Sequence, residues 1–237
     1  MQTSDIPGLP LAIAELEVRG EGGRRLLSID RLEIAPGSRV GIRGPSGAGK
    51  STLLYALAGL VAISSGSVRW GDQDIATLPD RRRTDFRRRH IGMVFQDFLL
   101  FEELSAFGNA TVAAMFCDRS QRARIDDTAR RTLDRLGLAD MAGRSVVRFS
   151  GGERQRVAVA RAMANDPAIL LADEPTASLD RQTADRLVAD LTEVAAGSGR
   201  TLIAVSHDAA LLSRMDRVLD LADGRLVADA DSDVSND

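Results

Sequence analysis

One lysine stands out among the basic residues of this chain of 237 residues. Lys50 is the only lysine beside thirty arginines. It lies in the run Gly44-Pro45-Ser46-Gly47-Ala48-Gly49-Lys50-Ser51, which fits the pattern G-x-x-x-x-G-K-[ST] at every fixed position. A slim ammonium on a flexible stem reaches between the β- and γ-phosphates of a nucleotide, where the wide fork of an arginine would collide with the backbone. The run therefore predicts a phosphate-binding loop, although chance alone produces the pattern in roughly one chain per hundred of this length.

The loop also indicates how a triphosphate would be held. Backbone N–H groups from Gly47 to Ser51 should converge on the phosphates, helped by the positive end of the helix that starts there. The hydroxyl of Ser51 is placed to ligate Mg²⁺, and Thr52 can reach the α-phosphate. We therefore expect a nucleoside triphosphate and Mg²⁺ as cofactors.

A pair of acidic residues follows an apolar run further along the chain. The run Ile169 to Ala172 is typical of a strand buried on both faces of a parallel sheet, and it delivers Asp173 and Glu174, after which Pro175 prevents its continuation. Ligands bind at the carboxyl edge of open α/β sheets, so both carboxylates should face the phosphate loop. Asp173 is then expected to hold Mg²⁺, and Glu174 to deprotonate the attacking water. The alternative is an acidic pair that merely ends a strand at the surface.

The segment Ser150-Gly151-Gly152-Glu153 has two compatible interpretations. Ser150 and Glu153 match a capping box that opens a helix. A helix start with two glycines and a free hydroxyl is also an anion site. The capping box does not explain the two glycines, because glycine weakens a helix. They are expected only where another group must approach the backbone closely.

Two more polar residues follow apolar strands. Gln96 comes after Met93-Val94-Phe95, and His207 comes shortly after the run that ends at Val205. Each should lie where a parallel strand ends, on the same sheet edge as Asp173. A lone glutamine or histidine at such a place is usually structural, but an edge shared with a nucleotide site favours a functional role.

The elements that position these residues can be predicted along the chain. Short strands from Leu11 to Ile42 are broken by glycines at 20–23 and by the Pro36-Gly37 turn, and the last of them feeds the phosphate loop. A helix with leucines at helical spacing is predicted from Ser51 to Leu60. The phosphate loop therefore lies between a strand and a helix, as its chemistry requires.

Residues 97–165 differ in character and favour helix. Apolar residues recur at helical spacing in Ile125, Ala129, Leu133 and Leu136. We interpret this segment as a helical insertion, after which the strand at 168–172 resumes the sheet.

The rest of the chain alternates helix and strand. A helix is predicted from about Arg181, and a strand follows from Thr201 to Val205. A hairpin turns at Asp223-Gly224. Residues 228–237 are rich in aspartate and predict a disordered acidic tail.

The composition is that of a globular protein, with 44% hydrophobic and 27% charged residues and a formal net charge of −3. Nothing in this balance favours nucleic acid as a partner. The arginines at 81–83 and 87–89 are more typical of a solvated helix face than of a binding patch. A single cysteine, Cys117, excludes an internal disulfide and suits a reducing compartment. We find neither a secretory signal nor an apolar run of the ~18 residues that a membrane span requires, so a cytoplasmic location is expected.

Five motifs follow one another in a characteristic order. They are GPSGAGKST at 44–52, VFQD at 94–97, FSGGERQRVAVARA at 149–162, ILLADEPTASLD at 169–180 and VSHD at 205–208. In this order the chain resembles the ATP-binding subunits of ABC transporters, up to about residue 227. The resemblance implies a single ABC ATPase domain over 1–237 with an α/β fold of the P-loop NTPase type. It implies a RecA-like core with a mainly parallel sheet and an N-terminal antiparallel β-subdomain at 11–96 and 166–227, and an α-helical subdomain inserted at 97–165.

The resemblance also implies a role for each motif. The phosphate loop, with Lys50, would bind ATP. Gln96 would sense Mg²⁺ and the attacking water, and would link the site to a membrane subunit. His207 would contact the γ-phosphate and steady Glu174, so that both act in hydrolysis.

The remaining motifs imply a dimer. Ser150, Gly151 and Gly152 would bind the γ-phosphate held by the opposite subunit, and Asp180 would lie at the dimer seam. The expected assembly is a head-to-tail homodimer with two ATP molecules sandwiched between phosphate loop and signature. The other partner of this dimer would be a transmembrane permease, which would hold the dimer peripherally on the inner face of the cell membrane. One departure from the family is that the segment 16–25 has no aromatic ring to stack on adenine.

Within the family, the segments 94–110 and 153–162 look most like the subgroup that pairs with lipoprotein-releasing, macrolide-exporting or cell-division permeases. The main hypothesis is an ATPase that drives a separate permease. An alternative is a non-transport ATPase of the same fold that regulates an envelope or cell-division complex. Soluble relatives of DNA repair or translation are disfavoured, because the chain has neither a long heptad insertion nor a second cassette.

Overall fold

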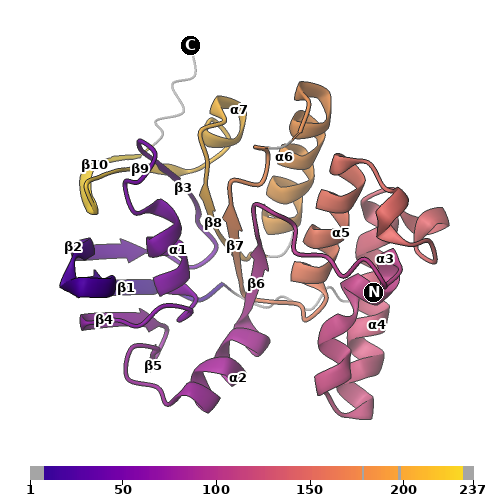
Figure 1. Ribbon diagram of the computed structural model, residues 1–237, viewed down its shortest axis with the longest axis horizontal. Coiled ribbons are helices and arrows are strands. Elements are labelled where there is room, and N and C mark those ends of the chain that lie inside the picture. Colours follow the sequence, from indigo (N-terminus) through magenta and orange to yellow (C-terminus); the bar gives the residue numbers. More distant parts are fainter. Residues whose placement is uncertain (1–7, 178, 197–198, 232–237) are drawn as a thin grey trace.

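The computed structural model describes residues 8–177, 179–196 and 199–231, and a sheet of six strands forms its centre (Figure 1). The strand order is β10-β9-β3-β8-β7-β6. The bounds are β3 Arg39–Arg43, β6 Ile91–Val94, β7 Ile169–Asp173, β8 Thr201–Val205, β9 Arg217–Ala222 and β10 Arg225–Asp231. All neighbours are parallel except β10, which pairs antiparallel with β9. The carboxyl ends of β3, β6, β7 and β8 therefore meet at one edge of the sheet.

The two central strands are buried along their whole length. Every residue of β7 and β8 is buried, as their continuous apolar sequences predict for strands covered on both faces. Side chains alternate between two hydrophobic clusters: Leu170 and Ala172 pack with helices on one face, while Ile169 and Leu171 pack on the other.

A second, antiparallel sheet lies on one side of the central one. Its order is β2-β1-β4-β5, with β1 Leu11–Arg19, β2 Arg25–Ile34, β4 Ser65–Trp70 and β5 Gln73–Asp74. Its strands alternate buried and exposed residues over much of their length, because one face packs on the core. Trp70 is buried, and its indole N–H donates a hydrogen bond of 2.9 Å to the carbonyl of Leu57, which ties this sheet to the helix that follows the phosphate loop.

That helix, α1 (Lys50–Leu57), lies between the two sheets in Figure 1. It ends three residues earlier than predicted, because the chain turns through Gly59 at φ 61°. Three other helices belong to the sheets: α2 Asp80–His90, α6 Arg181–Ala196 and α7 Ala209–Leu212. In the arginine-rich α2, Arg81, Arg82 and Arg89 are exposed, as expected of a solvated helix face, whereas Arg83, Arg87 and Arg88 are half-buried.

Helices predominate between β6 and β7, as the sequence predicts. They are α3 Ala106–Ala110, α4 Arg119–Arg135 and α5 Gly151–Met163, together with short 3₁₀ turns η2 Val112–Phe116, η3 Ala139–Met141 and η4 Val146–Arg148. The predicted face of α4 is confirmed, since Ile125, Ala129 and Leu133 are its buried residues. Asp118 caps α4 by accepting hydrogen bonds from the N–H groups of Ser120 and Gln121. The three helices lie together beside the sheets in Figure 1.

The predicted acidic tail begins too early, at residue 228. Strand β10 continues to Asp231, because it pairs with β9 across the hairpin. The carboxylate of Asp229 accepts a hydrogen bond of 2.6 Å from Nε of Arg217, so an ion pair adds to the backbone pairing. The rest of the predicted tail, 232–237, lies outside the described residues. No helix of the described segments has the length and apolarity to span a bilayer.

Candidate active site

The phosphate loop connects β3 to α1 and takes its shape from glycines. Gly49 has φ 96°, a left-handed conformation that side chains rarely adopt. A Cβ on Gly44 would lie 1.9 Å from the carbonyl oxygen of Leu221, so only glycine fits against the neighbouring strand. The turn of the β9–β10 hairpin supports the loop from below, since the N–H of Gly224 donates to the carbonyl of Ala48 at 2.9 Å. The conformation of the loop is therefore fixed by the neighbouring strand and hairpin.

The ammonium group of Lys50 lies inside this loop. It donates hydrogen bonds to the carbonyl oxygens of Gly44 at 2.8 Å and Pro45 at 3.0 Å. The residue is only 8% exposed. A buried cation that touches only carbonyl groups of its own loop is placed to exchange them for phosphate oxygens, which bind an ammonium more strongly.

Two oxygen ligands meet behind the loop. The hydroxyl of Ser51 donates to Oδ1 of Asp173 at 3.1 Å, and Asp173 is only 2% exposed. Burial, together with the carboxylates of Asp173 and Asp97, raises the pKa of Tyr55 to about 12. A hydroxyl and a buried carboxylate form a hard-oxygen pair, which fits Mg²⁺ bound by few protein groups and by phosphates.

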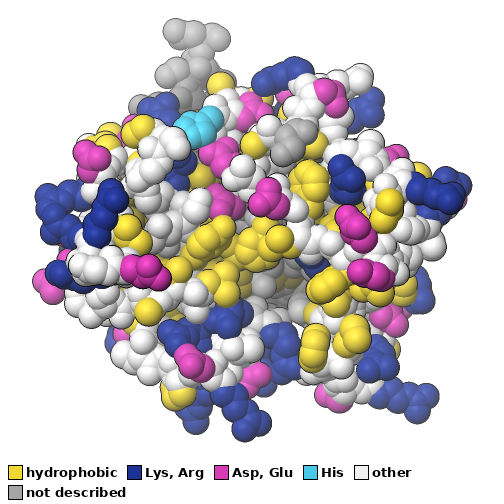
Figure 2. Space-filling view, viewed as in Figure 1, with side chains coloured by type: hydrophobic (Ala, Val, Ile, Leu, Met, Phe, Trp, Pro, Cys, Tyr) yellow, Lys and Arg dark blue, Asp and Glu magenta, His cyan; other side chains and the backbone are white. Residues whose placement is uncertain are grey.

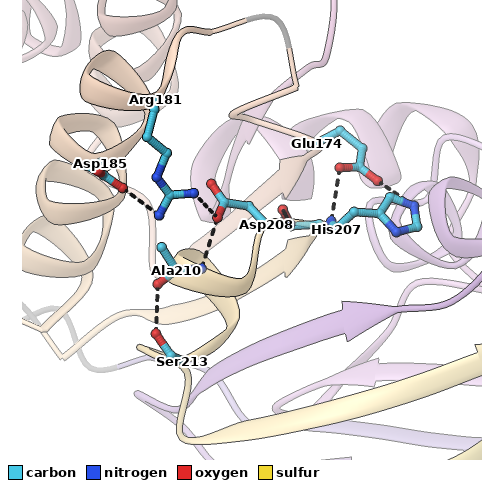
Figure 3. Close-up of polar contacts among 8 residues, drawn as sticks. Glu174, Arg181, Asp185, His207, Asp208, Ala210 and Ser213 are labelled. Carbon is cyan, nitrogen blue, oxygen red and sulfur yellow. Dashed lines mark hydrogen bonds and ion pairs between the residues drawn. The ribbon is translucent and has the colours of Figure 1, made fainter.

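Glu174 is held in a strained conformation beside His207. Its φ is 44°, unusual for a residue with a side chain. Its N–H donates to the carbonyl of Val205 at 2.9 Å, which fixes the backbone to β8. One carboxylate oxygen accepts the backbone N–H of His207 at 3.3 Å, and the other lies 3.3 Å from Nε2 of the same histidine (Figure 3). The carboxylate is therefore oriented by one residue through two contacts.

A pocket of about 710 Å³ joins these groups at the carboxyl edge of the sheet. The predicted residues that line it are Ser46, Gly47, Ala48, Gly49, Lys50, Ser51, Thr52, Gln96, Glu174 and His207. Asp173 does not line the pocket itself, but its carboxylate accepts the hydrogen bond from Ser51, which does. The four strand ends that the sequence assigned to one edge are thus brought together.

The signature residues form a separate group. Ser150 caps α5: its hydroxyl accepts the N–H of Glu153 at 3.3 Å, and the Glu153 carboxylate accepts the N–H of Ser150 at 2.7 Å, so the predicted capping box is confirmed. Among the described residues, those lining the pocket do not include any of the segment 150–152. A Cβ on Gly152 would lie 2.1 Å from Cγ2 of Thr183 in α6, so this glycine already has a close neighbour within the chain.

Asp180 precedes α6 and also stays off the pocket wall that the structure describes. Its carboxylate accepts the N–H of Thr183 at 3.1 Å and the hydroxyl of Thr183 at 2.6 Å. These hydrogen bonds hold the pKa of the Asp180 carboxyl below its usual value. Asp180 and Gly152 therefore meet at the same threonine, which joins the start of α5 to the start of α6.

Several residues of the site were not predicted from the sequence. Arg181 lines the pocket, and its guanidinium reaches Asp185 at 2.9 Å and Asp208 at 3.3 Å (Figure 3). Asp208 also caps α7 through the N–H of Ala210 at 2.9 Å. The position of Asp208 beside His207 was a possible signal, whereas an arginine after Asp180 gave none. Leu26, 37% exposed, is the large apolar side chain that the antiparallel sheet contributes to the pocket.

The arrangement combines three chemical elements. An amide-rich loop with a buried ammonium can bind phosphates. A hydroxyl and a buried carboxylate can hold a divalent cation against them. A carboxylate oriented by a histidine can accept a proton from water. Together these are the parts needed to hydrolyse a nucleoside triphosphate.

Comparison with known proteins gives a consistent result. The family model described as "ABC transporter" matches residues 27–177. The lipoprotein-releasing system ATP-binding protein LolD of Maricaulis maris is 42% identical over 215 residues, which cover 91% of this chain and 93% of the relative. The macrolide export ATP-binding/permease protein MacB 1/2 of Paracoccus denitrificans is 41% identical over 210 residues, or 89% of this chain. The chain spans about a third of the length of such MacB relatives, 31% in this case.

Solved structures share the same architecture. A dimeric structure of MJ0796, a bacterial ABC transporter cassette, has a TM-score of 0.84 at 31% sequence identity and covers 93% of this chain and 98% of the other. A second structure of MJ0796, a dimeric post-hydrolysis state bound to ADP and Pi, has a TM-score of 0.82 with the same identity and coverage. The predicted α/β fold of the P-loop NTPase type is confirmed by these likenesses.

Proposed function

The chain belongs to the ABC transporter family as an ATPase cassette, and from this premise we propose that it hydrolyses Mg-ATP in a head-to-tail dimer to drive a separate membrane permease. The observation that carries the proposal is the meeting of phosphate loop, buried carboxylate, strained glutamate and histidine around one pocket of about 710 Å³. These groups come from the ends of three different strands, β3, β7 and β8, and Gln96 adds a fourth, β6. A shared position that depends on so many elements favours function over chance.

In the proposed mechanism the phosphate loop binds ATP. The N–H groups from Gly47 to Ser51 point at the phosphates, and Lys50 leaves the carbonyls of Gly44 and Pro45 for the β- and γ-phosphates. Ser51, Asp173 and Gln96 would hold Mg²⁺, which would supply positive charge that neutralises the phosphates. Thr52 would bind the α-phosphate.

Hydrolysis would use Glu174 as the general base. Its carboxylate takes a proton from the attacking water, while His207 keeps the carboxylate in place and contacts the γ-phosphate. The strained backbone of Glu174 supports this role, since such conformations persist where the surrounding structure requires a particular side-chain direction.

The second half of the site is proposed to come from another copy of the chain. Ser150, Gly151 and Gly152 lie at the N-terminus of α5, a helix of 13 residues whose positive end suits a γ-phosphate. They are not among the described residues around the chain's own pocket, so a head-to-tail partner would supply them. Asp180 would then lie at the seam between the copies. The dimeric form of the solved MJ0796 cassette supports this arrangement.

An apolar surface is the proposed contact with the permease. Of the eight exposed large hydrophobic side chains that the structure describes, five lie between β6 and β7: Leu99, Phe101, Met115, Phe116 and Val147. Figure 2 shows hydrophobic side chains across the middle of this face and also on its right, over the helices α3 and α4 that lie between β6 and β7. Exposed apolar groups of this kind mark protein contacts. Docking here would place the cassette peripherally on the inner face of the membrane.

The names of the relatives suggest the kind of machine that the cassette drives. They describe an ATP-binding protein of a lipoprotein-releasing system and an ATP-binding/permease protein of macrolide export. We therefore favour a permease that acts on amphiphilic molecules at the cell envelope. The second candidate is an ATPase that regulates an envelope or cell-division complex without transport, and a transport assay on the copurified membrane partner distinguishes the two.

The decisive experiment replaces Glu174 with glutamine, which keeps the shape of the side chain and removes the base. ATP binding should persist, turnover should fall by roughly a hundredfold or more, and a dimer should accumulate in Mg-ATP on size exclusion. Glu193→Gln, an exposed change on α6, is the matched control and should behave as the wild type. A monomer with normal turnover would contradict both the assigned base and the dimer.

A further inference from the structure

The segment that follows Gln96 has an unusual backbone. Phe98 has φ 59° and Leu99 has φ 49°, so two consecutive residues with side chains adopt the left-handed conformation. Such conformations are unfavourable for residues other than glycine and persist only when contacts hold them. The segment must therefore be fixed by a neighbouring element.

Arg161, on α5, supplies those contacts. One terminal nitrogen of its guanidinium donates to the carbonyl of Leu99, and the other donates to the carbonyl of Phe98 at 2.5 Å. The fixed fork of an arginine matches two adjacent carbonyls in a way that an ammonium cannot.

The position of this guanidinium is costly. The side chain of Arg161 is partly buried, and burial lowers the pKa of the guanidinium without making it neutral at physiological pH. Within the described parts of the chain, no carboxylate lies at ion-pair distance from Arg161. A partly buried charge that serves two backbone carbonyls indicates that the position of those carbonyls matters.

The helix that carries Arg161 also carries the signature. Ser150 caps its first turn and Arg161 lies in its last turn. Arg161 follows Ser150 by eleven residues, which corresponds to about 16 Å along a helix axis. A single rigid helix therefore links the residues proposed to bind the partner's γ-phosphate to the segment beside Gln96 of the chain's own pocket.

We propose that Arg161 is a positioning residue that holds Phe98 and Leu99 in their left-handed conformation and thereby fixes Gln96 in the pocket relative to the signature helix. The inference rests on the proposed function, because Gln96 matters only if the pocket hydrolyses ATP. Leu99 is 55% exposed and belongs to the surface proposed for the permease. The guanidinium thus joins the C-terminal end of the signature helix to a segment that lies between Gln96 and the proposed permease surface.

The test is a double-mutant cycle between Arg161 and Gln96 in steady-state ATP hydrolysis by the full chain. Arg161→Ala should lower kcat roughly tenfold, the equivalent of one lost hydrogen-bonding contact to a charged group, and should change KM less than twofold. Arg161→Lys keeps the charge but not the fork, so its kcat should lie between those of the wild type and Arg161→Ala. In a Gln96→Ala background, Arg161→Ala should cause no further loss. Arg186→Ala, an exposed arginine of α6, is the control.

Hydrogen exchange gives a second readout without nucleotide. Amides 97–101 should exchange faster in Arg161→Lys, while those of α6 stay unchanged. Losses in kcat that add with Gln96→Ala, or unchanged exchange at 97–101, would overturn the inference. A wild-type chain that neither binds nor hydrolyses ATP would instead overturn the proposed function, so the two failures are distinguishable.

Discussion

Replacing Gly152 with alanine tests why a glycine stands in the first turn of α5. The added Cβ would lie 2.1 Å from Cγ2 of Thr183, far inside ordinary contact distance. Thr183 has little freedom to move, because its hydroxyl donates to Asp180 at 2.6 Å and its branched side chain has few rotamers. Overpacking of this kind costs about 1–3 kcal/mol, and alanine regains up to about 1 kcal/mol of helix propensity. With the full regain, the net expected loss in the free energy of unfolding is about 0–2 kcal/mol.

A compensating change makes the reasoning specific. Thr183→Ser removes Cγ2 and keeps the hydroxyl that bonds Asp180, at a cost of about 0.8 kcal/mol for one buried methyl group. The double variant Gly152→Ala, Thr183→Ser should recover most of the loss caused by the alanine. Urea unfolding of the four proteins gives a coupling energy, expected at about 1 kcal/mol or more. Full additivity would refute the packing explanation.

The same variants separate packing from catalysis. If Gly152 only accommodates Thr183, ATP turnover should return together with stability in the double variant. If its backbone also approaches a phosphate of the partner subunit, as proposed, turnover should remain low in a protein that is again stable. Turnover is measured at saturating Mg-ATP, so that altered affinity for nucleotide does not enter the comparison.

Three further predictions follow from the contacts of single groups. Lys50→Ala should abolish measurable ATP binding by calorimetry without unfolding the chain, because it removes the ammonium of the phosphate loop; retained binding would contradict the assigned loop. Gln155→Met should raise the free energy of unfolding by about 1–2 kcal/mol in urea, because the buried amide of Gln155 has no hydrogen-bond partner among the described residues. A loss of stability would show that the amide is hydrogen-bonded in solution. Burial alone would raise the pKa of Asp216, but its contacts with Arg39 hold that pKa below the usual value, and Arg43 does the same for Asp220. These two ion pairs therefore stabilise the folded chain above about pH 4, the usual pKa of an aspartate. The stabilisation is lost as the pH falls through the lower pKa values of the folded state. As the pH falls below about 4, the wild type should therefore lose stability more steeply than an Asp216→Asn, Asp220→Asn variant, and equal slopes would count against these pairs.

The sequence predicted most of the fold and most of the pocket, because both depend on local patterns. A strand buried on both faces is apolar throughout, and β7 is an example. A phosphate loop needs glycines and a lysine at fixed spacing, and 44–51 has them. Strand ends of a parallel sheet share an edge, so Gln96, Glu174 and His207 could be assigned to one site without knowing any distance.

The rest depends on contacts between distant segments. Arg161 meets backbone carbonyls 62 and 63 residues earlier in the chain, and a carbonyl carries no sequence signal. The positive φ of Glu174 also follows from its tertiary hydrogen bond to Val205. The prediction of a disordered tail from residue 228 was wrong for a related reason. Aspartate content alone favoured disorder, whereas the alternation of Asp229 and Asp231 in the sequence of β10 is compatible with a strand that pairs with β9.

The proposed division of the site between two copies would have an energetic consequence. Contacts of Lys50, Ser51 and the loop amides would be available to a nucleotide in a single chain, whereas those of Ser150 and its neighbours would require the partner. Only a triphosphate has the γ-phosphate to make both sets at once, so the proposed closed dimer would be favoured by ATP over ADP by the free energy of the contacts at α5. Because Arg161 joins the far end of α5 to the segment beside Gln96, loss of the γ-phosphate would reach the proposed permease surface through one helix. Hydrolysis would thus weaken the dimer and release that surface in the same step, which is how cleavage of one bond can do mechanical work.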